Sequence, residues 1–259
     1  MRNNIKHLAM LSPMLAVAGL AGAAMLASAD PAHSQSLNDV MGAGKKVAQA
    51  ATVSNAEMVA YFGQMADEMD RQNPLAPAKN PYAVRLAKLT KGMESYDGLT
   101  LDIQAYLVNE VNAFAMGDGT VRVYSGLMDK MTDDEVRCVI GHEIGHVKLE
   151  HGQKRMKRAL QQDAALSVAG TVSSGVRSLT NSQLGGMLQD VLYAQHSQAA
   201  ETQADDYALT FMAAKGYQRA ACATAMDKLA ALGGGGGIGL LKTHPDPAKR
   251  AKRMRKQIG

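Results

Sequence analysis

Residues 132–147 read TDDEVRCVIGHEIGHV. Thr132 followed three residues later by Glu135 is the pattern of a capping box, in which each side chain bonds the other's backbone at the start of a helix. Apolar residues then recur at helical spacing, and they are Val136, Val139, Ile140, Ile144 and Val147. The stretch therefore predicts a helix with one apolar face.

The same helix carries HEIGH, from His142 to His146. Residues four apart differ by about 40° around a helix, so both imidazoles project from one face, at a spacing that suits a tetrahedral zinc ion. Glu143 lies about 100° round from His142, beside the metal, where it can take a proton from the attacking water. We therefore expect one Zn²⁺ per chain, with His142 and His146 as ligands and Glu143 as the catalytic base.

A catalytic zinc site needs a third protein ligand. Glu201 is the candidate, because Glu201 and Asp205 are four apart on the next long helix and share a face. Glu201 would bind the metal, and Asp205 would accept the second ring N–H of a ligand histidine, which fixes the tautomer of that ring. The alternative interpretation of this pair is a solvated acidic face.

Two other histidines are weaker candidates. His151 follows His142 by nine residues, which places it on the opposite side of the same helix unless the helix ends first. We expect His151 to be a surface or helix-end residue. His196 could be a ligand, but no pattern around it supports that role.

The rest of the pattern predicts an α+β fold that is mainly α. Two β-rich runs, at 103–115 and 120–124 with a glycine turn between them, predict a small antiparallel sheet. The five glycines at 233–237 predict a mobile loop. Helices are expected elsewhere, at about 37–69, 81–91, 132–180 with a break near 173–175, 187–215, and from Pro247 onward.

The N-terminus has the pattern of a secretory signal peptide. Arg2 and Lys6 precede an apolar stretch at 8–26, and Ala27-Ser28-Ala29 supplies the small residues that signal peptidase needs. An uncleaved anchor is the alternative, because the stretch is long enough to span a bilayer. We expect a periplasmic protein with a signal peptide at 1–29, a disordered linker at 30–36 and one domain at 37–259, made of N-terminal helices (37–95) and a catalytic core (96–259).

Charge argues against nucleic acid as a partner. Without Arg2 and Lys6, the 26 remaining Lys and Arg exceed the 24 Asp and Glu by only two. The one strongly basic stretch, from Lys242 to Lys256, is interpreted as a solvated helix face. Contact with anionic headgroups, and so association with a membrane or with outer-membrane assembly proteins, is the alternative.

The two cysteines, Cys138 and Cys222, leave two interpretations open. In an oxidising compartment they could form a disulfide that closes a long loop, which the chain-entropy model values at about 4 kcal/mol. They could equally be two buried free thiols.

Taken together, the motifs resemble the HtpX/Oma-type gluzincin metallopeptidases, and most of all their soluble periplasmic members of the LoiP type. The resemblance covers about residues 37–258. LoiP-type members are commonly lipoproteins, whereas no cysteine precedes Cys138. The matching segments are Asn112 to Ala115, Gly126-Leu127-Met128, Glu135-Val136, Gly141 to Val147, Glu201 to Asp205, Thr243-His244-Pro245 and Arg250, together with Pro77, Pro81-Tyr82 and Arg85-Leu86.

The resemblance implies a mainly helical, gluzincin-type metalloprotease domain with a small sheet beside the active-site helix. It also implies that the protein cleaves unfolded or misassembled envelope proteins. It implies that the strand formed by Asn112, Ala113, Phe114 and Ala115 pairs with an extended substrate, which is a general mode of peptide binding. It also implies that His244 stabilises the oxyanion.

Two other functions were weighed against an endopeptidase. A zinc-binding chaperone or assembly factor with incidental hydrolysis would have no need of a base beside the metal, so the presence of Glu143 argues against it. An integral prenyl-protein protease is disfavoured because no segment after the leader approaches 18 apolar residues.

Overall fold

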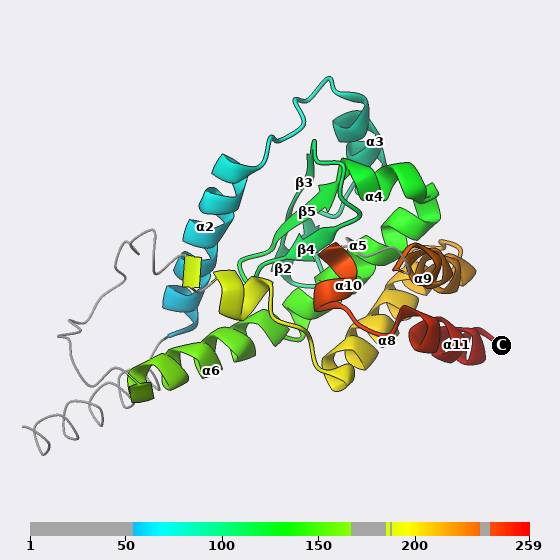
Figure 1. Cartoon of the computed structure of the whole chain (residues 1–259). Helices are drawn as coiled ribbons and strands as arrows, with labels where there is room; N and C mark the ends of the chain where they lie inside the picture. The colour runs from blue at the N-terminus through cyan, green and yellow to red at the C-terminus, as the bar shows by residue number, and fades with distance from the viewer. Residues whose placement is uncertain (1–53, 167–184, 187, 234–238) are drawn as a thin grey trace, which may run out of the picture. The chain divides into compact units, whose positions relative to one another are not determined.

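The computed structural model describes residues 54–166, 185–186, 188–233 and 239–259 (Figure 1). All of them belong to one unit, which spans Asp39–Gly259. Several expected segments lie outside the described residues. They are the signal peptide, the linker, the first part of the helix at 37–69, the end of the helical stretch at 132–180 with its break near 173–175, and residues 234–237 of the glycine loop.

A three-stranded sheet stands at the centre of the core, with its strands in the order β3-β5-β4. The strands are β3 (Asp102–Tyr106), β4 (Ala113–Ala115) and β5 (Thr120–Tyr124), and a separate antiparallel pair is formed by β1 (Ser95–Tyr96) and β2 (Leu99–Thr100). The expected small sheet is present, but it is mixed, because β5 runs antiparallel to β4 and parallel to β3. β5 takes the central place, with a neighbour on each side, and every residue of β5 is buried.

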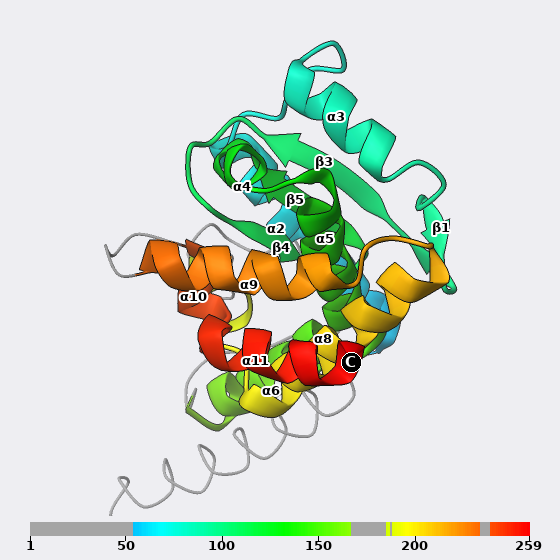
Figure 2. The same ribbon diagram turned by 90° about the vertical axis from the view of Figure 1, so that its right-hand side faces the viewer.

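Side chains alternate between the two faces of this sheet, so each face has its own cover. Val121 and Val123 of β5 pack in the larger apolar cluster with α5 (Asp133–Lys148). Tyr124 and the neighbouring Tyr106 and Phe114 pack in a second cluster with apolar side chains of α2 (Asn55–Gln72). Figures 1 and 2 show these two helices on opposite sides of the strands.

An ion pair fixes α2 against the sheet. The buried guanidinium of Arg122 donates to both carboxylate oxygens of Asp70, near the end of α2, at 2.9 Å. Asp70 also accepts a hydrogen bond from Tyr106. At the start of the helix, Ser54 and Glu57 form a capping box. The orientation of α2 therefore depends on directional polar bonds as well as on apolar packing.

The capping box expected at Thr132 and Glu135 is confirmed, and it begins α5. Against α5 pack α8 (Gln198–Ala214) and α9 (Ala220–Leu232), and α11 (Pro247–Ile258) runs beside α9 (Figure 2). The remaining helices are α3 (Pro81–Leu89), which has Pro81 at its first position as expected, α4 (Ser125–Lys130), α6 (His151–Leu166), the π-helical turn η1 (Leu188–Leu192) and α10 (Gly239–Thr243).

The single helix expected at 187–215 is wrong. The chain leaves helical geometry after η1, and α8 starts afresh at Gln198, where the Ser197 side chain accepts a hydrogen bond from Ala200 N–H. The break lets His196 N–H donate to Thr243 O, a contact distant in sequence that no local pattern reveals. The helix α9 was not among the expected ones, because its buried apolar side chains lie on more than one face and so blur the periodicity.

A disulfide joins Cys138 of α5 to Cys222 of α9, with their Cα atoms 5.3 Å apart. Of the two interpretations of the cysteines, the disulfide is therefore confirmed and the pair of free thiols is wrong. Cys138 lies one turn before His142, so the bridge ties α9 to the face of α5 that leads into the metal-binding motif.

We expect the double variant Cys138→Ala/Cys222→Ala to lose about 2–5 kcal/mol of unfolding free energy, because its unfolded chain is no longer constrained by a bridge across 84 residues. Urea unfolding of the oxidised protein, the reduced protein and the double variant measures this loss. The reduced wild type should match the variant. Equal midpoints for the oxidised and reduced proteins would contradict the expectation.

Candidate metal centre

Two glycines let α8 approach α5 closely. A Cβ atom on Gly145 would lie 3.1 Å from Tyr207 Cβ and 3.2 Å from Ala204 Cα, and one on Gly141 would lie 2.5 Å from the ring of Phe211. All three contacts are tighter than ordinary van der Waals separation. The two glycines of GHEIGH thus have a packing role, which is to bring α8 against the helix that carries the histidines.

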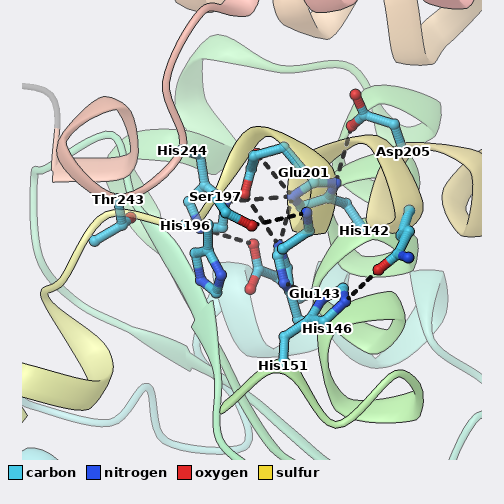
Figure 3. Close-up of polar contacts among 12 residues, drawn as sticks. His142, Glu143, His146, His151, His196, Ser197, Glu201, Asp205, Thr243 and His244 are labelled. Carbon is cyan, nitrogen blue, oxygen red and sulfur yellow. Dashed lines mark hydrogen bonds and ion pairs between the residues drawn. The ribbon is translucent and has the colours of Figure 1, made fainter. Parts of the chain in front are cut away.

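This approach gathers four buried side chains, His142, His146, Glu201 and His244 (Figure 3). One ligand atom from each lies within 4.8 Å of all the others, and no second such group was found among the described residues. The two Nε2 atoms of His142 and His146 are 3.0 Å apart. Glu201 Oε2 lies 3.5 Å from His142 Nε2, and Glu201 Oε1 lies 3.4 Å from His146 Nε2.

These separations fit a zinc ion. Ligand atoms 2.0–2.1 Å from a tetrahedral zinc are about 3.3–3.4 Å apart, close to the spacing of the two nitrogens and the carboxylate. Two imidazole nitrogens and one carboxylate oxygen are also a ligand set of catalytic zinc sites. The sequence-predicted ligands His142, His146 and Glu201 are therefore brought together in a geometry that can hold the metal.

The shifted pKa values of Glu201 and His146 favour the protonation states in which these two residues can bind a metal. Burial opposes the charge on Glu201, but the nearby imidazoles of His244 and His142 outweigh it and hold the pKa of Glu201 well below its usual range. Burial drives the pKa of His146 well below its usual value. At neutral pH Glu201 is thus a carboxylate and His146 a neutral imidazole, as metal ligation requires.

Asp205 and Arg250 lie behind His142. Asp205 Oδ1 is 3.0 Å from His142 Nδ1, and the guanidinium of Arg250 donates to both oxygens of Asp205 at 2.5 and 3.0 Å. Arg250 also pairs with Glu201 Oε2 at 2.6 Å. Burial and Arg250 oppose a charge on His142, yet Glu201 and Asp205 raise the pKa of His142 to about 9, so metal binding would displace its proton.

His151 lies behind His146, and its expected place at the surface is wrong. It is 9% exposed, and its Nδ1 is 2.9 Å from His146 Nδ1. The alternative expectation, that His151 lies at a helix end, is confirmed, because α5 ends at Lys148 and His151 begins α6. The expected position of His151 assumed one continuous helix, and the chain instead breaks between α5 and α6.

Glu143 is buried between the ligands and lacks a full set of partners. Its Oε1 has no hydrogen-bond partner among the described residues, and the nearest ring nitrogen, His244 Nε2, is 3.6 Å away. Burial raises the pKa of Glu143 above its usual value. A buried carboxylate with an unpaired oxygen beside a metal site can accept a proton from water.

His244 and His196 complete the group of rings. His244 Nδ1 lies 3.0 Å from Glu201 Oε1 and 3.3 Å from His142 Nε2, so it too faces the site. The ring of His196 packs on His146, with centroids 3.9 Å apart, and stacks on His244 at 4.9 Å. The ring nitrogens of His196 contact the guanidinium of Arg155. In the sequence, no pattern around His196 supports a role for it, and Arg250 stands only among the residues that match the family.

A cleft opens beside these residues. It is lined by Glu143, His146, His196 and His244, and by mostly apolar residues that include Phe62, Met65, Phe114, Ala115, Met116, Val191 and Leu192. Two of the four predicted substrate-binding residues, Phe114 and Ala115, are among the lining. Asn112 instead turns its side chain back to accept a hydrogen bond from Ala113 N–H.

The edge of β4 that faces away from β5 carries backbone groups of Ala113 and Ala115. Asn112 O accepts from Tyr124 N–H, and Met116 N–H donates to Thr120 O, so these even-numbered residues pair with β5. Because pairing alternates along an antiparallel strand, the N–H and C=O groups of the two alanines point the other way.

Comparisons with known proteins identify the family of this chain. Residues 87–258 match peptidase family M48. The chain is 38% identical over 222 residues to metalloprotease LoiP of Escherichia coli, which covers 85% of this chain and 88% of the relative. It is 34% identical over 246 residues to metalloprotease YcaL of the same organism, covering 95% and 96%.

A more distant relative is the mitochondrial metalloendopeptidase OMA1 of Arabidopsis thaliana. It is 32% identical over 154 residues, which cover 58% of this chain and 30% of the relative. Across the part of the chain that the structure describes, no helix is long and apolar enough to cross a membrane. The family match and the two long alignments show that this chain is a zinc metalloendopeptidase and belongs to peptidase family M48.

Proposed function

We propose that this protein hydrolyses unfolded or misassembled envelope proteins in the periplasm, at a zinc site formed by His142, His146 and Glu201. The observation that carries the proposal is the ligand geometry, with Glu143 Oε1 buried and unpaired beside it. When bound, zinc supplies Lewis acidity, which polarises a scissile carbonyl and lowers the pKa of water. Glu143 takes the proton of the attacking water and later delivers it to the leaving amine.

The outward edge of β4 is the proposed binding site for substrate. An extended peptide laid beside this edge could exchange backbone hydrogen bonds with Ala115 N–H and with the C=O groups of Ala113 and Ala115, while Ala113 N–H already donates to Asn112 Oδ1. That mode of binding requires a segment whose own backbone is unpaired, which folded proteins rarely expose. This requirement supports unfolded or misassembled chains as the substrate class.

His244 is proposed to stabilise the oxyanion, and Asp205 to orient His142. The position of His244, between Glu201 and Glu143, supports a role beside the reacting carbonyl. The contact of Asp205 with His142 Nδ1 leaves Nε2 of that ring to face the metal.

Export to the periplasm is supported by the leader pattern and by the Cys138–Cys222 disulfide, since such bridges persist in oxidising compartments. N-terminal sequencing after cell fractionation tests it. We expect a mature chain that starts at Asp30 in the soluble periplasmic fraction. A chain that starts at Met1 in the membrane fraction would contradict the proposal.

Glu143→Gln keeps the side-chain volume but removes the basic carboxylate. We expect this variant to fold and to bind one zinc, while casein cleavage falls by at least roughly 10²–10⁴-fold, the contribution of a positioned acid–base group. The exposed Glu94→Gln makes the same chemical change at the surface and should cleave normally. Zinc content is measured on each preparation, and near-normal cleavage by a zinc-loaded Glu143→Gln protein would refute the mechanism.

Glu201→Ala should lose zinc and activity together, because only two of the proposed ligands remain. Asp205→Ala should weaken zinc binding by roughly 10–100-fold, as losses of groups that orient a ligand do. Asp206→Ala is the matched control, since Asp206 is the next residue on α8 and pairs with Arg253 away from the metal. Zinc titration against a fluorescent chelator measures all three, and full zinc binding by Glu201→Ala would place the third ligand elsewhere.

A further inference from the structure

Behind the proposed ligand His146 lies a chain of two hydrogen bonds that the reaction itself does not use. His146 Nδ1 is 2.9 Å from His151 Nδ1, and His151 Nε2 is 2.9 Å from Gln203 Oε1. Figure 3 shows His151 on the far side of His146 from Glu201. Because His151 is buried, its two hydrogen bonds are not contacts between exposed side chains.

The backbone turns sharply to place His151 there. After α5 ends at Lys148, Glu150 adopts φ 58°, in the left-handed region that residues with a Cβ rarely occupy. This reversal starts α6 at His151 and directs its ring back toward the helix just left. Without the turn, a residue nine positions after His142 would point to the opposite side.

The direction of each hydrogen bond follows from the metal site. If Nε2 of His146 offers its lone pair to a metal, the neutral ring must carry its proton on Nδ1. That proton can then be donated only to a nitrogen lone pair, so His151 Nδ1 accepts it. His151 in turn carries its proton on Nε2 and donates to Gln203 Oε1, an acceptor. Every group in the chain is satisfied without a charge.

The same helix supplies the support behind both histidines. Asp205 of α8 contacts Nδ1 of His142 directly, at 3.0 Å. Gln203, two residues earlier on α8, reaches Nδ1 of His146 through His151. The helix α8 thus provides Glu201 as a ligand and also a hydrogen-bond acceptor, direct or relayed, for each of the two histidines.

We propose that His151, held by Gln203, is a positioning residue that fixes the tautomer and ring orientation of the metal ligand His146. The proposal rests on the zinc site described under the proposed function. Hydrogen bonds to the outer nitrogen of a ligand histidine raise its basicity, and their loss costs roughly 10–100-fold in metal affinity.

Three variants and one control test this. His151→Leu keeps a similar bulk but offers no acceptor. His151→Asn places its Oδ1 near the position of the imidazole Nδ1 and can still accept from His146. Gln203→Leu leaves His151 in place but removes its support. Lys154→Met is the control, because Lys154 caps Leu149 O in the same α5–α6 turn without touching a ligand.

The measurement is the dissociation constant for zinc, obtained by chelator competition, with the melting temperature of each metal-free protein measured alongside. We expect His151→Leu to bind zinc roughly 10–100-fold more weakly, Gln203→Leu to lie between it and wild type, and His151→Asn and Lys154→Met to bind nearly as the wild type does. In the cobalt-substituted protein, the paramagnetically shifted Nδ1–H signal of His146 should exchange faster with solvent in His151→Leu.

Unchanged zinc affinity in a folded His151→Leu protein would overturn the inference. If that variant fails to fold, Gln203→Leu and His151→Asn decide. A merely structural role of His151 predicts that Gln203→Leu binds zinc as tightly as the wild type. It also predicts that His151→Asn loses zinc affinity only in proportion to its lowered melting temperature. A wild-type protein that binds no zinc would instead contradict the proposed function, so the two failures are distinguishable.

Discussion

The close contact between α5 and α8 is the constraint on which the site depends. His142 and His146 lie on one helix and Glu201 on the other, so the ligand atoms meet only if the two backbones approach across Gly141 and Gly145. A larger side chain at either position would separate the helices, and a shift of 1 Å is a large fraction of a metal–ligand bond. The glycines inside the metal-binding motif are therefore as much a part of the site as its histidines.

The buried charges at this contact compensate one another. Glu201 and Asp205 are both almost wholly buried, which would be costly without partners. Arg250 from α11 pairs with both carboxylates, and the imidazoles face them from α5. The C-terminal helix therefore contributes to the metal centre through one side chain, although most of its other basic residues lie at the surface.

The sheet and the cleft depend on contacts distant in sequence. Because β5 is the central strand, β4 lies at an edge of the sheet with outward backbone groups, next to the metal site. The helix α2 forms another wall through Phe62 and Met65, and the Arg122–Asp70 ion pair holds it there. The same packing that stabilises the domain thus shapes the place where a substrate would bind.

Local patterns in the sequence were enough to predict the capping box at Thr132, the shared face of His142 and His146, and the shared face of Glu201 and Asp205. Each of the three follows from the geometry of one helix. They also predicted a small sheet, though not the parallel pairing of β3 with β5, since that pairing depends on the path of the chain between the two strands. Only the tertiary structure could decide the disulfide, the break at 193–197 and the place of His151. The disulfide, and the His196–Thr243 contact that accompanies the break, join residues far apart in the chain. The place of His151 depends on a left-handed turn at Glu150, which the residue types there do not predict.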